Sequence, residues 1–574
     1  MLLYYILMRW RILNKVKSKK EKVKSEEIIT LLLENRGLKT ERQQEEFLHP
    51  QRPQDLTTKE VGISPTELKK AIARIKKAIK AKEKIIIYGD YDTDGVCGTA
   101  ILWEAIYKLG GEVMPFIPKR KEGYGMKVAR LEEMAKGGIK LVITVDQGIV
   151  AVKQAEKAKD LGLDLIITDH HLPGEKKPKA LAILHTTRLS GSGVAWFLAK
   201  NLGDESGLIH PRGGVAPAAH LGGEVGLDLA TIGTVSDVVP LLGPNRSIVK
   251  YGLEAVRKTK RIGLISLYQT AGISPENIGT YEIGFIIGPR LNASGRIDDP
   301  LDSLRLICTK DENRAVDLAQ KIEARNRQRQ DLTQQILIHA RNLWLTTDGK
   351  SSLIFVQDKS YEEGVIGLVA GKLMEEFYRP AVVLAPRENH WVASARSIEE
   401  FNIVEAIRAC AEFLGPHGGH RKAAGFTIEE SKISLVRQRL IELAQQKLDE
   451  EKLKPTLTID MELGLKDLSL TLYDQLATLA PFGEGNPQPV FATKNVQMAD
   501  AQLVGTESKH LKLRLVDSSS GATLEAIGFG FGNFFPQLSP EVPVDIAYNL
   551  TTDEWNGRRK IQLRIKDMKV RGEK

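Results

Sequence analysis

Residues 84–98 read KIIIYGDYDTDGVCG, an apolar run that ends in three aspartates spaced two apart. The isoleucines at 85–87 are β-branched and continuous, which is typical of a strand buried on both faces of a parallel sheet. Asp90, Asp92 and Asp94 therefore stand at the carboxyl end of that strand. Because like carboxylates at close range repel one another, this cluster predicts a bound divalent cation. A solvated acidic turn is the alternative, and the D-x-D-x-D-G spacing also resembles half of a calcium loop.

Two later apolar runs also end in potential metal ligands. Residues 141–145 precede Asp146, residues 165–168 precede the Asp-His-His triplet 169–171, and Asp237 follows a further apolar stretch. The carboxyl ends of parallel strands meet at one edge of a sheet, where ligands bind, so we expect these side chains to converge. Taken alone, an aspartate at a strand end is more often a helix cap, and a histidine is more often a core or surface residue. Together, imidazole and carboxylate ligands suit manganese, magnesium or zinc.

Composition sets broad limits on the class of protein. The 574 residues predict three or four domains, and 42% hydrophobic with 27% charged residues is an ordinary globular composition. A net charge of +9 and a pI of about 9.1 are compatible with a polyanionic partner. Cys97, Cys308 and Cys410 lie far apart, which argues against a disulfide scaffold or a zinc ribbon and fits a reducing cytoplasm.

The start of the chain is apolar and then basic. Residues 1–8, MLLYYILM, are too short to span a bilayer and lack a following cleavage site, so we predict no export signal and no membrane partner. We expect them to begin a helix packed on the body of the protein. Residues 15–24 are rich in lysine and predict a solvated helix face, with nucleic-acid contact as the alternative.

Apolar periodicity predicts the order of the domains. An N-cap serine at 64 predicts a helix after it, with an apolar stripe at Leu68, Ile72, Ile75 and Ile79. Residues 85–242 alternate in the manner of an α/β fold with a mostly parallel sheet. A long polar helix is expected from 312 to about 344, largely exposed to solvent, linking this lobe to a second, smaller α/β domain. After residue 454, short alternating strands predict a small barrel with lysines and arginines on one face.

Two polar segments carry residues suited to a phosphate. Residues 118–125, PKRKEGYG, include Tyr124 and either line a substrate entrance or form a plain exposed loop. Residues 281–299 pass from an apolar run into a polar loop with Asn292 and Arg296, and the planar fork of arginine matches a phosphate. The alternative is that the arginines of this loop pair only with the aspartates at 298 and 299.

The chain resembles a known superfamily in five motifs. YGDYDTDGV at 88–96, VDQG at 145–148, DHH at 169–171 and SDVVPL at 236–241 look like the four motifs of the DHH phosphoesterases, and GHRKAAGF at 419–426 looks like their associated C-terminal domain. Their order and the chain length further resemble the bacterial single-strand-specific exonucleases within it, over roughly residues 30–574. Two departures are the segment 180–189, which lacks an expected Asn-Pro, and Gln147 and Cys97 in place of smaller polar residues.

The resemblance implies a metal-dependent 5′ to 3′ exonuclease that hydrolyses single-stranded DNA to 5′-mononucleotides with two ions, Mn²⁺ or Mg²⁺, about 3.5 to 4 Å apart. The implied metal ligands are Asp90, Asp92, Asp94, Asp146, His170 and Asp237, with Asp146 as the bridge. The implied catalytic residues are Asp92, Asp94, Asp146, His170 and His171, with His171 on the phosphate or supporting a ligand. The implied substrate-binding residues are Tyr124, Asn292, Arg296, Ser394, Arg396, Gly418, Gly419 and His420.

The resemblance also implies a domain plan and partners. The expected parts are an N-terminal helical segment (1–70), a parallel-sheet DHH domain (71–311), a connecting helix (312–345), a smaller α/β DHH-associated domain (346–453) and an OB-type barrel (454–574). A monomer acting in DNA repair and recombination, with a single-strand-binding protein and a helicase as partners, is implied too. One alternative is a DHH phosphodiesterase for short oligonucleotides or cyclic dinucleotides, whose chains typically lack the barrel. Another is a non-catalytic replication scaffold, which should have lost the acids that this chain retains.

Overall fold

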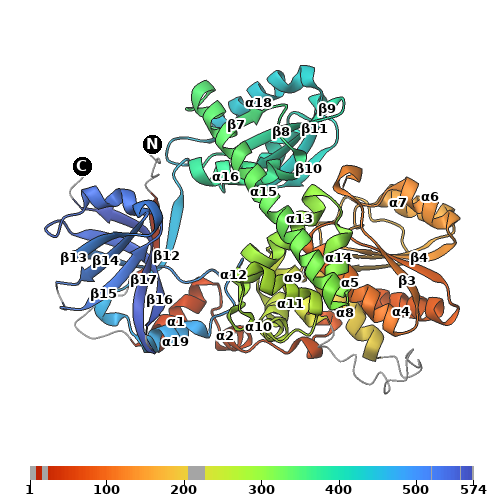
Figure 1. Ribbon diagram of the computed structural model, residues 1–574, viewed down its shortest axis with the longest axis horizontal. Coiled ribbons are helices and arrows are strands. Elements are labelled where there is room, and N and C mark those ends of the chain that lie inside the picture. Colours follow the sequence, from red (N-terminus) through yellow and green to blue (C-terminus); the bar gives the residue numbers. More distant parts are fainter. Residues whose placement is uncertain are drawn as a thin grey trace.

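The computed structural model describes residues 8–15, 24–123, 125–204, 226–518, 520–555 and 557–571. Two α/β domains lie at the two ends of the long helix α15 (Glu312–Thr347), and a β-barrel lies beside them (Figure 1). Residues 1–7, Tyr124 and most of the basic run 15–24 lie outside the described residues. No helix in the described ranges is both long and apolar enough to cross a bilayer.

The first domain is built on a five-stranded parallel sheet in the order β3-β2-β4-β5-β6. Its strands are β2 (Lys84–Tyr88), β3 (Glu112–Phe116), β4 (Ile139–Val145), β5 (Asp164–Asp169) and β6 (Ala182–His185). Ile85 and Ile87 face one buried core, while Ile86 faces another on the opposite side of the sheet. Helices therefore cover both faces, which explains why the strand at 85–87 is apolar without alternation.

The helices of this domain begin where the sequence supplies caps. Ser64 caps α4, and Asp92 caps α5 by accepting a hydrogen bond from Gly95 N at 2.9 Å. Helices α5, α8 and α9 pack against one another on one face of the sheet, whereas α6 and α7 contribute to the core on the other. The helices up to the connecting helix are α3 (Thr58–Val61), α4 (Pro65–Lys80), α5 (Thr93–Lys108), α6 (Val128–Lys136), α7 (Val152–Asp160), α8 (Gly191–Asp204), α9 (Leu227–Ser236), α10 (Gly243–Arg257), α11 (Ile262–Ala271), α12 (Thr280–Glu282), the π-helix η4 (Ile283–Ile287), α13 (Gly288–Ile297) and α14 (Leu301–Cys308).

The connecting helix α15 is present as predicted, but its polar middle is partly buried. Arg325 is 7% exposed and pairs with Asp302 at 2.7 Å and with Asp298. Glu323 pairs with Arg290 at 2.7 Å. The expectation of a largely solvent-exposed helix is therefore wrong over this stretch, because α13 and α14 bring complementary charges against it.

The second domain has a mixed five-stranded sheet in the order β10-β11-β9-β8-β7, in which only β7 and β8 are parallel. This agrees with the smaller α/β domain predicted from the sequence. Its elements are β7 (Ile354–Gln357), α16 (Glu363–Phe377), β8 (Ala381–Arg387), β9 (His390–Arg396), α17 (Ile403–Arg408), β10 (His417–His420), β11 (Ala423–Ile428) and α18 (Ile433–Lys447).

The C-terminal strands close into a barrel in the order β13-β14-β15-β17-β16, because β16 also pairs with β13. Its core is formed by every second residue along a strand, as in Leu511, Leu513 and Leu515 of β14. The elements are β12 (Thr456–Glu462), α19 (Leu470–Ala477), β13 (Phe491–Val504), β14 (His510–Val516), β15 (Thr523–Gly528), β16 (Val544–Trp555) and β17 (Arg558–Val570).

The N-terminal segment belongs to the barrel, and it is not entirely helical. Residues Arg9–Lys15 form strand β1, which pairs in parallel with β12. Helix α1 (Ser25–Asn35) buries Ile28, Leu32 and Leu33 in the barrel core, and α2 (Glu41–Leu48) follows it. The expected helix at the chain start is wrong for residues 9–15, because the strand that pairs with them lies more than 400 residues away in the sequence.

Arg246 of α10 joins the first domain to the connector that enters the barrel. Its guanidinium donates to the carbonyl oxygens of Phe47 at 2.7 Å, Leu479 at 3.0 Å and Ala480 at 2.9 Å. It also lies 3.7 Å from the centre of the Phe47 ring. Burial, and then the nearby Arg36, lower the pKa of Arg246 to about 10. One side chain therefore satisfies carbonyls from two distant segments.

We expect Arg246→Met to lower the free energy of unfolding by about 2 kcal/mol, because buried carbonyls lose their donors. Chemical unfolding followed by tryptophan fluorescence measures this change. Lys258→Met, at the exposed end of the same helix, serves as the control and should change stability little. Equal stability of Arg246→Met and the wild type would contradict the proposed role of the arginine.

Candidate functional site

The acids and histidines singled out in the sequence meet at the carboxyl edge of the parallel sheet. Asp90 and Asp92 follow β2, Asp146 follows β4, and the two histidines follow β5. Three overlapping groups have potential ligand atoms within 4.8 Å of one another. The groups are Asp146, His170 and His171; Asp94, His170 and Asp237; and Asp90, Asp92 and Asp146. All six expected metal ligands therefore lie in one cluster.

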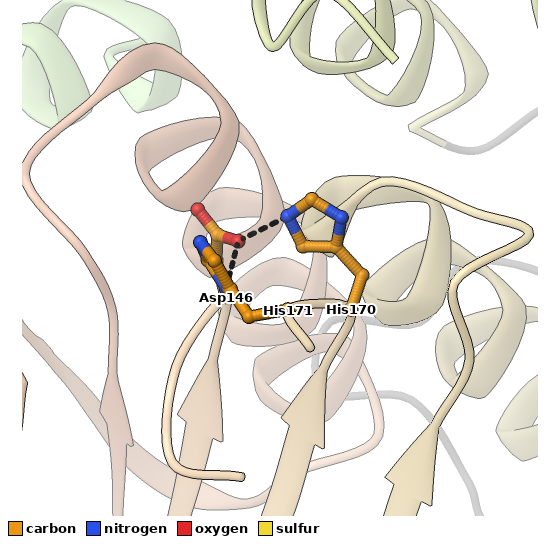
Figure 2. A group of neighbouring side chains, drawn as sticks. All are labelled: Asp146, His170 and His171. Atoms are coloured by element: carbon orange, nitrogen blue, oxygen red, sulfur yellow. Dashed lines mark ion pairs between the residues drawn. The ribbon is translucent and has the colours of Figure 1, made fainter. Parts of the chain in front are cut away.

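The two histidines approach Asp146 from the end of the neighbouring strand, as Figure 2 shows. His170 Nε2 lies 3.0 Å from Asp146 Oδ1 and 3.4 Å from Asp237 Oδ2. His171 Nδ1 lies 2.8 Å from Asp169 Oδ1 and 3.8 Å from Asp146 Oδ1. His170 thus sits among the acids, while His171 is oriented by Asp169.

Burial and mutual repulsion raise the pKa values of these acids. Burial and then Asp92 raise the pKa of Asp90, and burial and then Asp94 raise that of Asp146 well above its usual range. The same two causes, burial first and Asp94 second, raise the pKa of Asp237 to about 9. A cation at the centre would remove this repulsion and favour the ionised acids.

The cluster fits a metal ion on an independent observation. Asp90 Oδ1 is buried and has no hydrogen-bond partner within the described ranges. A buried carboxylate oxygen without a partner is costly unless something else satisfies it. Oxygen and imidazole donors at this separation are the ligand types that Mn²⁺ and Mg²⁺ accept. The residues present therefore suit such an ion.

Helix α8 positions Asp94 through its first backbone amides. Gly191 N donates to Asp94 Oδ2 at 2.6 Å, and Ser192 N donates to Oδ1 at 3.1 Å. A Cβ at Gly191 would lie 2.5 Å from Asp146 Oδ1, and one at Gly233 would lie 2.5 Å from Asp94 Oδ1. Sequence reasoning missed these residues, although the Gly-Ser-Gly run at 191–193 was a usable sign of close backbone approach.

Two residues at the cluster have left-handed backbone conformations. Asp146 has a φ of 61°, and Val238, directly after Asp237, has a φ of 59°. This conformation is unusual for any residue other than glycine and strained for a β-branched valine. Asp146 is held in place by a 3.0 Å hydrogen bond from its own N–H to Thr168 O. The backbone therefore has an unfavourable conformation at Asp146 and directly after Asp237.

The departures from the family pattern lie at supporting positions. Gln147 Nε2 donates to Gly89 O at 2.6 Å and so fixes the turn before Asp90. In the segment that lacks Asn-Pro, His185 Nε2 lies 2.7 Å from His171 O. Cys97 is buried in the core of the domain. None of these residues displaces an acid of the cluster.

A group of arginines lies between the acid loop and the second domain. Burial, followed by Arg120, Arg329 and Arg396, lowers the pKa of Arg296 to about 9. Arg296 Nη1 donates to Gly364 O at the start of α16, 3.2 Å away. Four positive side chains from separate segments therefore share one region. The sequence-based prediction named Arg296 and Arg396, included Arg120 only within the segment 118–125, and did not assign Arg329 to the site.

The charge of this arginine cluster (Arg120, Arg296, Arg329 and Arg396) is not neutralised by the aspartates that follow Arg296. Asp298 pairs with Arg325, and Asp299 approaches Arg305 at 3.8 Å. Among the described residues, no carboxylate forms an ion pair with Arg296 or Arg396. The alternative interpretation of the loop arginines is therefore not what the structure shows. Arginines without carboxylate partners are suited to an anionic ligand.

The expected phosphate residues of the second domain share one face of its sheet. Arg396 of β9 is in register with Ala423 of β11, which is in register with His420 of β10. Ser394 is in register with Gly425 and then Gly418 in the same way. Side chains in register point to the same face, and two strand spacings place His420 about 10 Å from Arg396.

The other expected substrate-binding residues are Asn292, Gly419 and Tyr124. Asn292 Oδ1 accepts the Thr93 N–H at 2.8 Å, so Asn292 fastens α13 to the acid loop. Gly419 has a φ of 140°, and a Cβ there would meet the backbone of Ala424. Tyr124 lies outside the described residues. Arg120, in the same segment 118–125, places a guanidinium 4.4 Å from the centre of the Tyr91 ring.

A carboxylate and histidine cluster at the carboxyl edge of a parallel sheet, a facing arginine cluster and a terminal barrel define a DHH-type phosphoesterase with a nucleic-acid-binding domain. Family comparison agrees. The DHH family N-terminal domain matches residues 84–214, the DHHA1 domain matches 350–448, and the RecJ OB domain matches 459–567.

Individual relatives are similar over nearly the whole chain. The single-stranded-DNA-specific exonuclease RecJ of Bacillus subtilis is 37% identical over 98% of this chain and 71% of its own. The crystal structure of RecJ with Mn²⁺ from Thermus thermophilus has a TM-score of 0.81 at 29% identity, covering 98% of this chain and 79% of that one. Its Mg²⁺ complex has a TM-score of 0.72 at 27% identity, covering 98% and 78%. The chain belongs to the RecJ family, which confirms the resemblance.

Proposed function

We propose that this protein is a 5′ to 3′ exonuclease that hydrolyses single-stranded DNA to 5′-mononucleotides in repair and recombination. The observation that carries the proposal is the pairing of a buried acid cluster with an arginine cluster in which Arg296 and Arg396 form no ion pair with a carboxylate of the described residues. The first suits cations and the second suits a phosphate, so together they suit phosphodiester hydrolysis. The relative from Bacillus subtilis is named a single-stranded-DNA-specific exonuclease, which supports the substrate class.

In this proposal the ions are Mn²⁺ or Mg²⁺, held by Asp90, Asp92, Asp94, Asp146, His170 and Asp237. When bound, they would activate a water molecule and stabilise the leaving oxygen. Burial, the largest single cause, opposes protonation of His171, but the hydrogen bond with Asp169 and the negative charges of Asp169, Asp90 and Asp92 together raise the pKa of His171. A protonated His171 would donate a hydrogen bond to a phosphate oxygen of the strand.

The arginine cluster is proposed to bind the phosphate at the 5′ end. Arg296 comes from the first domain and Arg396 from the second, so a bound phosphate would contact both lobes. Ser394, His420 and the bare backbone at Gly418 would complete that surface. Only a strand end can reach both lobes while the chain behind it leaves toward the barrel. A duplex would be too wide to follow.

A side-by-side cleavage assay tests the proposal. We expect 5′-labelled single strands to release labelled mononucleotide first, whereas closed circles and blunt duplexes resist. EDTA should abolish hydrolysis, and Mn²⁺ or Mg²⁺ should restore it. Efficient cutting of circles, or release from the 3′ end first, would contradict the proposed polarity and indicate a general phosphodiesterase.

The barrel is proposed to bind the strand behind the active site. Lys512, Arg514 and Arg564 point outward from β14 and β17, but Lys512 pairs with Glu525 at 3.1 Å. Phe529, which is 53% exposed, has the Arg564 guanidinium 5.3 Å from its ring centre. The basic face predicted from the sequence is therefore present, with an aromatic side chain at its edge that was not predicted.

We expect Arg514→Gln and Arg564→Gln to reduce the slope of log binding constant against log salt by about 0.7 each, because each loses a phosphate contact. Fluorescence anisotropy of a long single strand at several salt concentrations measures the slope. Lys159→Gln, on α7 of the first domain, serves as the control. An unchanged slope in both barrel variants would place the DNA-binding surface elsewhere.

Other features of the proposal rest on the family resemblance. We propose that the protein acts as a monomer in the cytoplasm, with a single-strand-binding protein and a helicase as partners. Size-exclusion chromatography with light scattering, and pull-down with a purified single-strand-binding protein, would test the oligomeric state and the first partner.

A further inference from the structure

Two exposed aromatic side chains lie outside the site described above. Tyr281 is 60% exposed and Phe285 is 70% exposed. Their rings are stacked, with centres 4.9 Å apart and planes at 28°. Large aromatic rings usually lose most of their exposed surface on folding, because their apolar area is unfavourable in water. Two such rings held together at the surface therefore suggest a ligand-binding surface.

The helix under these rings explains their exposure. Tyr281 is in α12 and Phe285 is in the π-helix η4, whose Ile283 and Ile287 are fully buried. A Cβ at Gly288 would lie 2.5 Å from Ser236 Oγ, so the opposite face of the helix packs tightly on α9. A π-turn inside a helix is uncommon and is frequent at functional sites. Here it leaves both rings on the outward face.

This helical run connects the barrel to the active site. At its start, Thr280 Oγ1 donates to Phe482 O, 2.7 Å away, in the connector that leads to the barrel. Further along, Asn292 holds the acid loop, and Arg296 belongs to the arginine cluster. Asn292 follows Phe285 by seven positions, a rise of about 10 Å along the helix. Figure 1 shows α12 on the side of the first domain that faces the barrel.

We infer that Tyr281 and Phe285 form a stacking platform for the bases of the single strand between the barrel and the metal centre. Every base has an aromatic face, so stacking binds a strand without reading its sequence, as an exonuclease requires. The platform rests on the proposed exonuclease function and adds a base-binding site to its phosphate contacts. A duplex, whose bases are already stacked on each other, offers the rings no exposed face.

Binding of matched strands tests the inference. The probes are a 5′-phosphorylated thymidine oligonucleotide and the same strand with abasic residues, each followed by fluorescence anisotropy without divalent metal. We expect Phe285→Ala and Tyr281→Ala each to weaken binding of the intact strand about 10-fold. Phe285→Trp should retain affinity, and Phe285→Leu, which keeps apolar area without a ring, should lose it. The variants should bind the abasic strand as the wild type does.

Tyr107→Ala is the matched control, because Tyr107 is 53% exposed and stacks on Trp103 but lies at the end of α5. Thermal unfolding of every variant shows whether a loss of affinity comes from the missing aromatic ring or from a loss of the folded structure. Wild-type affinity in Phe285→Ala, or an equal loss on intact and abasic strands, would overturn the inference. Failure of the wild type to hydrolyse any single strand would instead overturn the proposed function, so the two failures are distinguishable.

Discussion

We expect Asp146→Asn to reduce hydrolysis of single-stranded DNA about 10³-fold or more, while the variant binds the strand with nearly wild-type affinity. Asp146 is shared between two of the three potential ligand groups and lies against His170. Its loss should therefore disturb every ion at the centre. Affinity should persist because strand binding depends mainly on the arginine cluster and the barrel.

Asparagine is the suitable replacement for two reasons. It has the same shape as aspartate, and it tolerates the left-handed backbone at this position, where φ is 61°. The substitution also removes a buried carboxylate whose pKa is raised by burial and then by Asp94. We therefore expect the metal-free variant to be at least as stable as the wild type, and the increase in Tm on adding Mn²⁺ to shrink.

Single-turnover hydrolysis, strand binding without metal and thermal unfolding with and without Mn²⁺ measure these effects. Asp160→Asn, an exposed carboxylate at the end of α7, serves as the control and should behave as the wild type. Near-normal turnover in Asp146→Asn would reject the metal assignment. Loss of strand binding together with turnover would show that the acid cluster supports the fold of the cleft.

We expect Arg296→Ala and Arg396→Ala each to slow hydrolysis of 5′-phosphorylated single strands about 10- to 100-fold, equivalent to roughly 1.5 to 3 kcal/mol for a charged hydrogen bond. On strands with a 5′-hydroxyl the loss should be much smaller, because the terminal phosphate is absent. His420→Ala should act in the same direction with a smaller effect, since His420 is exposed.

The ratio of kcat/KM for the two kinds of strand measures the effect independently of general damage. Arg421→Ala is the control, because Arg421 follows His420 but donates to Glu399 O at 2.7 Å and is exposed. An equal loss on phosphorylated and hydroxyl ends would contradict binding of the terminal phosphate. It would then place these arginines on an internal phosphate of the strand.

Local sequence was sufficient for the parallel sheet and for the part of the acid cluster that follows its strands. The apolar run at 85–87 can only be buried on both faces, and a strand with that requirement places the following Asp90, Asp92 and Asp94 at the carboxyl edge of the sheet. The same rule places Asp146 and His170, whereas Asp237 stands at the end of helix α9 and Asp94 lies within α5, so the packing of these helices completes the cluster. The short alternating strands after residue 454 were visible for the same reason, because alternation with period two is local.

Only the tertiary structure decided which distant segments complete the sites. Strand β1 pairs with β12, and Arg120, Arg296, Arg329 and Arg396 meet although they belong to four separate segments. Likewise, Arg325 became buried because Asp298 and Asp302 lie against it. Periodicity and propensity report the neighbours of a residue along the chain. The partner of an edge strand or of a buried charge is set by packing between elements far apart in sequence, so no local pattern records it.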